Sequence, residues 1–232
     1  MKNTIEPISY LWHKILEEKK IPKNGTIVEI APGYEPKIGN ALALLGFCGT
    51  IYVVEPDIEA ANYLKGLYEK ILPKATCILL IKPLEEIVPG LDIPPRVDAL
   101  LASHPFDDMV IATIIQRSSF FTEEKEDGNE LSGTIKDVYE SIHDEEYSHA
   151  ILETVAGWKK IIESLQPYYV IASQYPSQTL TIKGLVKRQN SGYKVLDTLK
   201  EDYSDSLSFT NRVARFGFKG DGRWWLAATF TR

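Results

Sequence analysis

Thr26-Ile27-Val28-Glu29-Ile30-Ala31-Pro32-Gly33-Tyr34 is the stretch of sequence that decides the fold of this 232-residue chain. Its apolar residues predict a buried strand over Thr26–Ala31, and the Pro-Gly pair that follows predicts a sharp turn. A second apolar strand, Ile51–Glu55, ends at another acid. A helical pattern over Pro36–Leu45 separates the two strands. This strand-helix-strand order is typical of a parallel sheet.

The same alternation of strand and helix patterns continues along the chain. Further strands are expected at Thr76–Ile81, Val97–Ala102, Tyr168–Ala172, Gly192–Leu199 and Trp224–Thr231. Further helices are expected at Pro7–Lys20, from Asp57 to about Leu72, and at Met109–Gln116, Tyr147–Leu165 and Thr181–Gln189. We therefore expect a single α/β domain over residues 1–232, with a seven-stranded, mostly parallel sheet, an antiparallel C-terminal strand and helices on both faces.

Two segments are candidates for lids over a site in such a domain. One is the N-terminal helix 7–20, for which the alternative is a helix packed on the sheet. The other is the acid-rich insert of about 117–148. The His, Asp and Glu residues of that insert match no established metal-ligand spacing, so we expect no metal site.

Composition and charge indicate which kinds of partner and which cellular compartment to expect. The net charge of −6 gives no basic excess for a phosphate backbone, which argues against a nucleic-acid partner. The two cysteines, Cys48 and Cys77, lie in apolar surroundings and are expected to be buried, reduced thiols. The sequence has neither a signal-peptide pattern nor an apolar run long enough for a membrane span, so we expect a cytoplasmic protein without membrane contact. The oligomeric state is left open.

The turn after the first strand has the chemistry of a ligand site. In open parallel sheets, ligands bind at the carboxyl ends of the strands, and Gly33 lets the backbone approach a ligand closely. Glu29 and Glu35 flank this turn, and their negative charge is expected to repel a phosphate. S-adenosylmethionine (SAM) has no phosphate but carries an α-ammonium, a sulfonium and a ribose diol. Glu55 suits the ribose hydroxyls as a bidentate acceptor, so the acids indicate SAM.

With these motifs the chain resembles the class I SAM-dependent methyltransferases, which have a Rossmann-like fold. The resemblance covers about Gly25 to Arg232. It rests on the segments Val28–Gly33, Val53–Asp57 and Val97–Pro105, on Leu165-Gln166-Pro167, and on Gly192–Val195 with the last strand, which resembles the family's C-terminal hairpin. The resemblance implies a cofactor site formed by Glu29, Ala31, Pro32, Gly33, Tyr34, Glu55, Pro56, Leu84 and Ser103.

The chain departs from the family at two places. The family's turn usually carries three glycines, and here Gly33 keeps the middle place while Ala31 and Glu35 occupy the other two. The family often has an adenine-contacting acid after the third strand. Here only Glu85 and Glu86 are available, one or two places late.

The segment after the fourth strand is the candidate reaction centre. His104 is a candidate for the base that takes a proton from the methyl acceptor, because imidazole titrates near neutral pH. The alternative for His104 is a structural imidazole bonded to the backbone. Asp107 or Asp108 is a candidate for binding an amine of the substrate.

The leading hypothesis is a SAM-dependent methyltransferase that acts on a small molecule or a protein side chain. Transfer of an aminopropyl or aminocarboxypropyl group from the same cofactor is one alternative. A degenerate member of the fold that binds a partner without catalysis is another. A nicotinamide dehydrogenase would suit Glu55 but not the acids beside a pyrophosphate.

Overall fold

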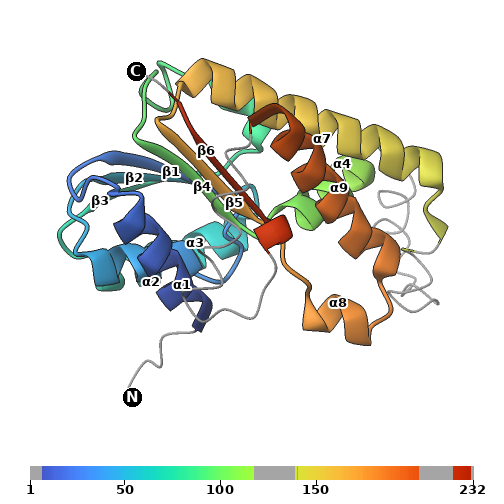
Figure 1. Ribbon diagram of the computed structural model, residues 1–232, viewed down its shortest axis with the longest axis horizontal. Coiled ribbons are helices and arrows are strands. Elements are labelled where there is room, and N and C mark those ends of the chain that lie inside the picture. Colours follow the sequence, from blue (N-terminus) through green and yellow to red (C-terminus); the bar gives the residue numbers. More distant parts are fainter. Residues whose placement is uncertain (1–6, 118–138, 140, 204–221, 231–232) are drawn as a thin grey trace.

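Six strands form one sheet in the described part of the chain, residues 7–117, 139, 141–203 and 222–230 of a computed structural model (Figure 1). The strands are β1 (Thr26–Ile30), β2 (Thr50–Val54), β3 (Thr76–Leu80), β4 (Ala99–Ser103), β5 (Tyr169–Ser173) and β6 (Trp225–Thr229). Their order across the sheet is β3-β2-β1-β4-β5-β6. Strands β1 to β5 run parallel, and β6 pairs antiparallel with β5.

This order positions the site. The chain moves outward from β1 to β3 and then returns to the other side of β1 with β4. The point between β1 and β4 is therefore the topological switch point, where a crevice for ligands opens at the carboxyl ends of the strands. The prediction of a Rossmann-like, mostly parallel sheet with an antiparallel C-terminal strand is confirmed.

The prediction of a seventh strand at Gly192–Leu199 is wrong. These residues lie in the middle of helix α9 (Val186–Tyr203). The helix buries Gly192, Val195, Leu196 and Leu199, whose spacing of three and four residues follows one face of a helix. The predicted C-terminal hairpin is therefore a helix followed by the single strand β6 within the described residues.

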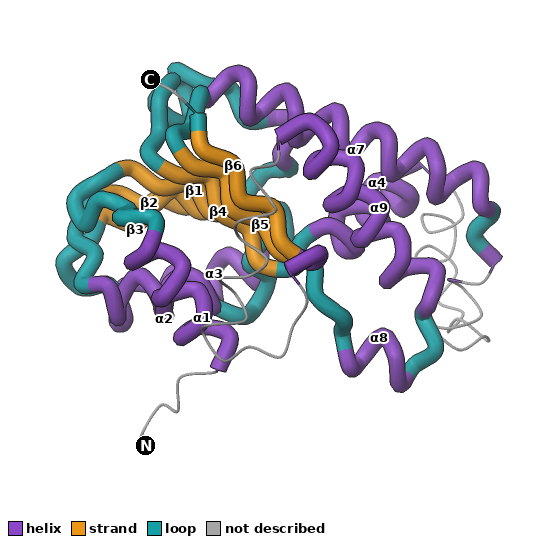
Figure 2. Tube along the Cα trace, in the orientation of Figure 1, coloured by secondary structure: helices purple, strands orange, loops and turns teal. Residues whose placement is uncertain are grey.

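Helices cover both faces of the sheet, as predicted (Figure 2). One face carries α1 (Pro7–Glu18), α2 (Lys37–Leu45) and α3 (Ile58–Ile71), and the other carries α4 (Phe106–Arg117), α7 (Asp144–Leu165) and α9. Successive strand residues alternate between these faces, so Ile27 packs on the first face while Val28 and Ile30 pack on the second. The direction of each strand-end side chain follows from this alternation.

Local signals fix the ends of the helices around the switch point. The Asp57 carboxylate caps α3 by accepting from the amides of Glu59 (2.8 Å) and Ala60 (3.1 Å). Gly46 ends α2 in the left-handed conformation, with φ of 74°. Asp57 therefore starts α3 directly after β2, and Gly46 ends α2 before β2. Cys48 in the connection after α2 is exposed, so the prediction that it is buried is wrong.

Helix α1 packs on the sheet as part of the core. Trp12, Ile15 and Leu16 are fully buried, and α1 lies beside α2 (Figure 1). This packing is the one given by the simpler interpretation of the N-terminal helix, and a role of its first residues as a lid stays a prediction. Most of the other candidate lid, residues 118–138 and 140, lies outside the described residues.

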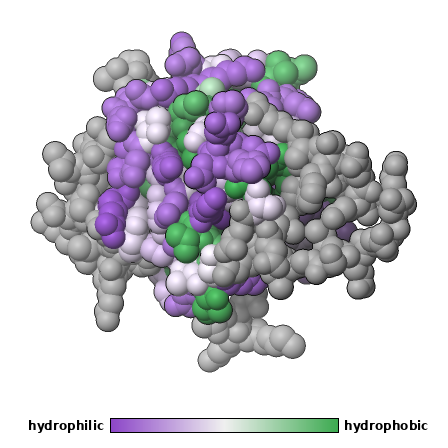
Figure 3. Space-filling view, turned by 90° about the vertical axis from the view of Figure 1, so that its right-hand side faces the viewer, coloured by the Kyte–Doolittle hydropathy of each residue, from purple (hydrophilic) through white to green (hydrophobic). Residues whose placement is uncertain are grey.

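Helix α8 (Gln178–Ile182) projects from the body of the molecule on the side shown in Figure 3. On this face, hydrophilic side chains are interrupted by separate hydrophobic ones (Figure 3). Ile182 at the end of α8 is 84% exposed. The predicted helix Thr181–Gln189 is thus divided between α8 and the start of α9.

Candidate functional site

The turn after β1 bends sharply and is held by Glu55. Ala31 and Gly33 both have positive φ, 46° and 61°, and the left-handed region is costly for a residue with a Cβ such as Ala31. The buried Glu55 carboxylate accepts from the amide of Gly33 (2.8 Å) and from the amide of Asp57 (3.1 Å). Glu55 therefore joins the turn after β1 to the tip of β2. Burial raises the pKa of Glu55, and the two amide bonds oppose this shift.

Glu29 points away from this turn. Its side chain lies on the face of α2 and α3, where it accepts a hydrogen bond from the Tyr68 hydroxyl and is 1% exposed. Burial raises the pKa of Glu29 to about 8, although the bond from Tyr68 opposes the shift. The carboxyl therefore holds its proton at neutral pH. The expectation that a negative Glu29 repels phosphate at the turn does not apply, since Glu29 is neutral and borders neither cavity described below.

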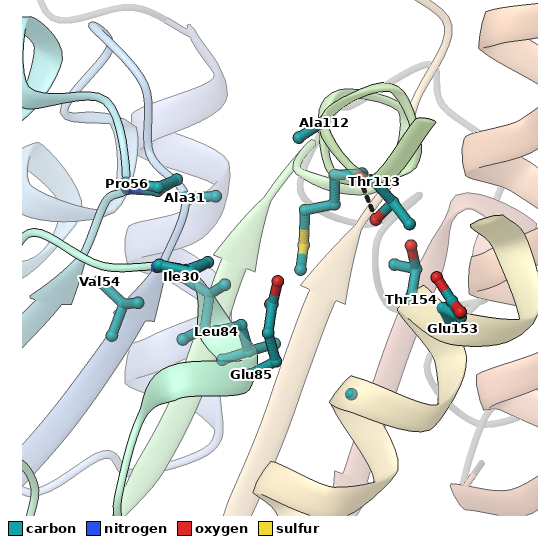
Figure 4. A pocket seen from close by; sticks show the side chains of 13 residues that line it. Ile30, Ala31, Val54, Pro56, Leu84, Glu85, Ala112, Thr113, Glu153 and Thr154 are labelled. Carbon is teal, nitrogen blue, oxygen red and sulfur yellow. Dashed lines mark hydrogen bonds between the residues drawn. The ribbon is translucent and has the colours of Figure 1, made fainter. Parts of the chain in front are cut away.

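Cavity 1 is an apolar slot of about 270 Å³ between the strand tips and the helices of the second face. Figure 4 shows the tips of β1 and β2 on one side, with Ile30 and Val54, and α4 and α7 on the other. The 3-10 helix η1 (Leu84–Glu86) contributes Leu84 and Glu85 to its floor. The predicted cofactor residues Ala31, Pro56 and Leu84 all line this slot.

Cavity 2 is wider, about 950 Å³, and lies over the ends of β1, β4 and β5. Its lining includes most of the other predicted site residues, namely Ala31, Pro32, Gly33, Tyr34, Ser103 and His104. It also includes Glu35 and Lys37, which form an ion pair with each other. Ala31 borders both cavities, so both reach the turn after β1.

His104 lies at the tip of β4 in a strained conformation. Its φ is 66°, and its amide donates to the carbonyl of Ser173 (2.8 Å). Nδ1 of the ring lies 3.2 Å from the Asp107 carboxylate, and Nε2 lies 2.6 Å from the carbonyl oxygen of Tyr175. Gln174 Nε2 also lies 3.4 Å from Nε2. Both ring nitrogens are therefore in contact with protein atoms, so a methyl acceptor can reach Nε2 only if its contact with the Tyr175 carbonyl opens.

Asp107 lies beneath His104 at the centre of a buried polar cluster. It is 1% exposed and accepts from Gln174 Nε2 (2.7 Å) and from Arg188 Nε (3.1 Å) as well as facing His104. Burial alone would raise the pKa of Asp107, but the bonds and charges of His104, Gln174 and Arg188 hold it below its ordinary value. Asp107 is therefore a carboxylate that orients the His104 ring. Asp108, which also pairs with Arg188, lines cavity 2.

Sequence reasoning did not find Gln174 or Arg188. They come from the segment after β5 and from α9, 67 and 81 residues away from Asp107. Nothing in the local sequence marks either residue, because their contacts with Asp107 depend on how α9 packs. Glu85 had a local signal in its place after the third strand, and it does line cavity 1.

Other kinds of site are not found in the described ranges. Within residues 7–117, 139, 141–203 and 222–230, no group of three or more His, Cys, Asp or Glu side chains gathers to hold a metal ion. None of the helices in these same ranges combines the length and the apolar character that a bilayer crossing requires.

Comparison with known proteins finds similarity in fold only. No family model matches the sequence, and no curated protein matches it. Among solved structures, the chain is similar to the CcbJ methyltransferase from Streptomyces caelestis, with 13% identity over 73% of this chain and 50% of that one and a TM-score of 0.42. It is also similar to the glycopeptide N-methyltransferase MtfA in complex with S-adenosylhomocysteine, with 14% identity over 73% of this chain and 54% of that one and a TM-score of 0.40. The bifunctional kinase-methyltransferase WbdD is similar with 11% identity over 74% of this chain and 28% of that one and a TM-score of 0.41. The chain thus spans between 28% and 54% of the length of these three proteins.

Proposed function

We propose that this chain is a SAM-dependent methyltransferase whose acceptor is a small molecule or a protein side chain. The observation that carries the proposal is the position of Glu55, which lines neither cavity itself but is hydrogen-bonded to the turn that borders both. Its neighbour Pro56 lines cavity 1, and Gly33, to which it is hydrogen-bonded, lines cavity 2. A ligand with an apolar base, a diol and a charged amino-acid end would place these three parts in cavity 1, at Glu55 and in cavity 2.

Glu55 retains the capacity to bind a diol. Each of its carboxylate oxygens accepts one backbone amide, and a carboxylate offers about four acceptor positions in total. The second position on each oxygen would accept a ribose hydroxyl from a ligand that reaches this buried carboxylate. Bound SAM would supply an electrophilic methyl group, and the residues of the chain would hold and orient the reactants around it.

The same geometry disfavours a pyrophosphate cofactor. In dinucleotide-binding folds, the amides of the turn after β1 face the phosphates. Here the Gly33 amide donates to Glu55, so a carboxylate already takes up this donor. Glu35 beside it is paired with Lys37. The occupied Gly33 amide, and not the charge of Glu29, therefore favours SAM over a nicotinamide dinucleotide.

We propose that cavity 2 takes the amino-acid end of SAM and the methyl acceptor, with His104 and Asp107 at the reaction centre. Asp107 would fix the His104 ring by facing Nδ1. Nε2 would then receive the acceptor's proton once its contact with the Tyr175 carbonyl opens. Proximity and alignment of the acceptor would supply most of the rate enhancement.

Titration calorimetry with SAM tests the placement of Glu55. Glu55→Ala is expected to weaken binding by about 1–3 kcal/mol through loss of charge-assisted hydrogen bonds. Glu55→Gln, which keeps one acceptor oxygen, should lose less. Glu59→Gln is the matched control, since Glu59 is an exposed acid in the first turn of α3. Unchanged affinity in Glu55→Ala would refute the site.

Product analysis separates the proposed reaction from its alternatives. Methyl transfer releases S-adenosylhomocysteine, and aminopropyl or aminocarboxypropyl transfer releases methylthioadenosine. Binding of SAM without either product, across amine, hydroxyl and carboxylate acceptors, would favour a binding protein without catalysis.

A further inference from the structure

Two ion pairs at cavity 2 have a buried cation and an exposed acid. In the described lining, Lys37 pairs with Glu35, and Asp108 pairs with Arg188 of α9. The Lys37 side chain is 16% exposed, whereas that of Glu35 is 58% exposed. Likewise the Arg188 side chain is 17% exposed, whereas that of Asp108 is 64% exposed. In both pairs, the positive charge therefore lies on the inner side and the negative charge lies at the rim.

The acids beside His104 are already paired with Arg188. Its guanidinium donates from Nε to Asp107 (3.1 Å) and also pairs with Asp108. A further bond from Nη1 to the Tyr139 hydroxyl (3.0 Å) fixes the position of Arg188. An ammonium that entered the site would meet carboxylates whose charge is already compensated. The binding of a substrate amine by Asp107 or Asp108, which the sequence suggests, is therefore disfavoured.

Lys37 keeps its charge in the wall of cavity 2. Burial alone would lower the pKa of Lys37, but Tyr175 and Glu35 outweigh this effect and raise it. The ammonium lies over the Tyr175 ring, 5.6 Å from the ring centre. A cation held in this wall attracts an oxygen with lone pairs and repels a second ammonium.

Ser103 presents a hydrogen-bond donor to the same cavity. Its Oγ accepts from Trp12 Nε1 (3.0 Å), and none of the described residues accepts the proton of the Ser103 hydroxyl. A hydroxyl oxygen of a ligand can accept this proton, whereas an ammonium only donates. Together with Lys37, Ser103 therefore favours an oxygen nucleophile beside His104.

The pair of His104 and Asp107 indicates which kind of oxygen this is. A carboxylate has no proton to lose at neutral pH, so it needs no base, whereas a hydroxyl does. A phenol has a pKa of about 10, and an alkyl alcohol is a far weaker acid, so an imidazole base suits the phenol better. The side chains of Tyr34, Tyr175 and Pro32 give the cavity flat, largely apolar walls for an aromatic ring.

We propose that the methyl acceptor of cavity 2 is an uncharged phenol, with Lys37 as the specificity-determining residue that disfavours cationic amines. This inference rests on the proposed function and names the class of acceptor. The phenol oxygen would bond to the methyl carbon while the carbon–sulfur bond breaks and its electron pair stays on sulfur. The phenol proton would pass to His104 Nε2. The products would be an aryl methyl ether and S-adenosylhomocysteine.

Equilibrium binding of 4-ethylphenol, tyramine and phenethylamine to the full chain, without SAM, tests this selectivity. Tyramine adds an ammonium to the structure of 4-ethylphenol, and phenethylamine has the ammonium without the hydroxyl. 4-Ethylphenol should bind about tenfold more tightly than tyramine, and phenethylamine should bind most weakly. A capped tyrosine peptide, used as a further ligand and acceptor, shows whether the phenol belongs to a small molecule or to a protein side chain.

Substitutions at the Glu35–Lys37 pair test the assignment to residues, with opposite expected signs. Lys37→Met keeps the length of the side chain without its charge, and should reduce the preference for 4-ethylphenol over tyramine at least about threefold. Glu35→Gln leaves Lys37 uncompensated and should raise this preference. Lys14→Met is the matched control, since Lys14 is an ion-paired lysine that lines neither cavity, and it should leave the preference unchanged.

The pH profile of a variant without the base tests the phenol step. His104→Gln should slow methyl transfer to 4-ethylphenol at neutral pH by at least about a hundredfold. Its activity should recover as pH rises towards about 10, because the phenol then ionises without a base. A variant that stays equally slow up to this pH would overturn proton transfer from a phenol to His104.

The outcomes separate this inference from the proposed function. Equal affinity for 4-ethylphenol and tyramine in a chain that binds SAM would overturn the inference and leave the proposed function standing. Methyl transfer to amines and not to phenols would do the same. A preference for 4-ethylphenol that Lys37→Met retains in full would overturn the assignment to Lys37. The same preference in a chain that does not bind SAM would support the selectivity of cavity 2 and overturn the proposed function.

Discussion

Glu29 and Glu55 are acids at the ends of neighbouring strands, but their surroundings give them different roles. Glu55 accepts two backbone amides, one of them from the turn that borders both cavities. Glu29 lies on the face of α2 and α3 and is buried against Tyr68. Glu29 is inside β1 whereas Glu55 lies just beyond the end of β2, and this difference in position decides between the two environments. Glu29 therefore contributes to the pH dependence of stability, and Glu55 is the residue placed for a ligand.

Glu29→Gln should flatten the dependence of stability on pH. The folded-state pKa of Glu29 is raised to about 8 by burial, above its ordinary value of 4.5. Between pH 4.5 and about 8, Glu29 is ionised in the unfolded chain but protonated in the folded chain. The free energy of unfolding is therefore highest at low pH and falls as pH rises towards 8. One such group contributes a slope of up to about 1.4 kcal/mol per pH unit. Glutamine keeps an acceptor for Tyr68 and does not titrate.

Urea denaturation of both proteins at several pH values from 5 to about 9 measures this effect. The variant should gain stability relative to the wild type as pH rises through the window. Glu163→Gln, at an exposed position, should follow the wild-type slope. Parallel pH profiles for the wild type and Glu29→Gln would show that Glu29 titrates normally in the folded chain.

At the scale of helices, the two glycines Gly157 and Gly192 show how α7 and α9 differ. Gly157 in α7 lines cavity 1, and a Cβ built on it meets no atom within 4 Å. Gly192 in α9 packs closely, because a Cβ there would lie 2.7 Å from Gln174 Nε2 and 3.0 Å from the amide of Asp107. Gln174 cannot easily move, since it bonds both Phe106 and Asp107.

The same substitution at these two glycines should change stability in opposite directions. Gly157→Ala should stabilise the protein by about 1 kcal/mol, because alanine favours the helix and space is available. Gly192→Ala should destabilise it by about 1–3 kcal/mol through overpacking against Gln174, despite the same gain in helix propensity. Urea denaturation of both variants checks the signs. Stabilisation by Gly192→Ala would show that α9 can shift away from Gln174.

Filling cavity 1 from α7 provides a separate prediction at this scale. Gly157→Leu places a bulky side chain in the slot that we assign to the purine base, so SAM affinity should fall at least about tenfold, the equivalent of about 1.4 kcal/mol. The fold should persist, since the added atoms enter a cavity. Calorimetry measures binding, and Gly157→Ala serves as the control that fills less of the slot. Full affinity in Gly157→Leu would place the base elsewhere.

At the scale of the whole molecule, Trp12 connects the beginning of the chain to its end. Its fully buried ring lies 5.1 Å from the ring of Trp225 in β6, in an edge-to-face arrangement. Its indole Nε1 donates to the Ser103 hydroxyl (3.0 Å) at the tip of β4. The N-terminal helix thus supports both the last strand and the floor of cavity 2.

Trp12→Ala should destabilise the protein by about 3–5 kcal/mol, through the lost packing and the cavity that remains. Tyr10→Ala on the same helix, at a half-exposed position, should change stability by less than about 0.5 kcal/mol. Thermal or urea unfolding compares the two. A loss of under about 1 kcal/mol in Trp12→Ala would mean that the helix contributes little to the fold.

Much of the sheet could be predicted from the sequence because its signals are local. The apolar residues of β1 to β6 form short continuous runs in the sequence. The structure places these six strands within about two residues of the predicted bounds. The turn Ala31–Tyr34 and the acid Glu55 are likewise local, since they follow directly after strands. The prediction of a strand at Gly192–Leu199 was wrong because a short apolar pattern fits both the two-residue repeat of a strand and the 3.6-residue repeat of a helix. Only packing against α4 and α7 selects the helix.

The sequence by itself therefore determined the order of the strands and helices up to β5, the parallel sheet and the edge at which a ligand would bind, because each depends on residues close together in the chain. Only the tertiary structure decided that Glu29 turns away from that edge, that Arg188 and Gln174 surround Asp107, and that α7 closes cavity 1. These contacts join residues up to 81 positions apart. Their partners are set by which helix packs on which face, which no local pattern specifies.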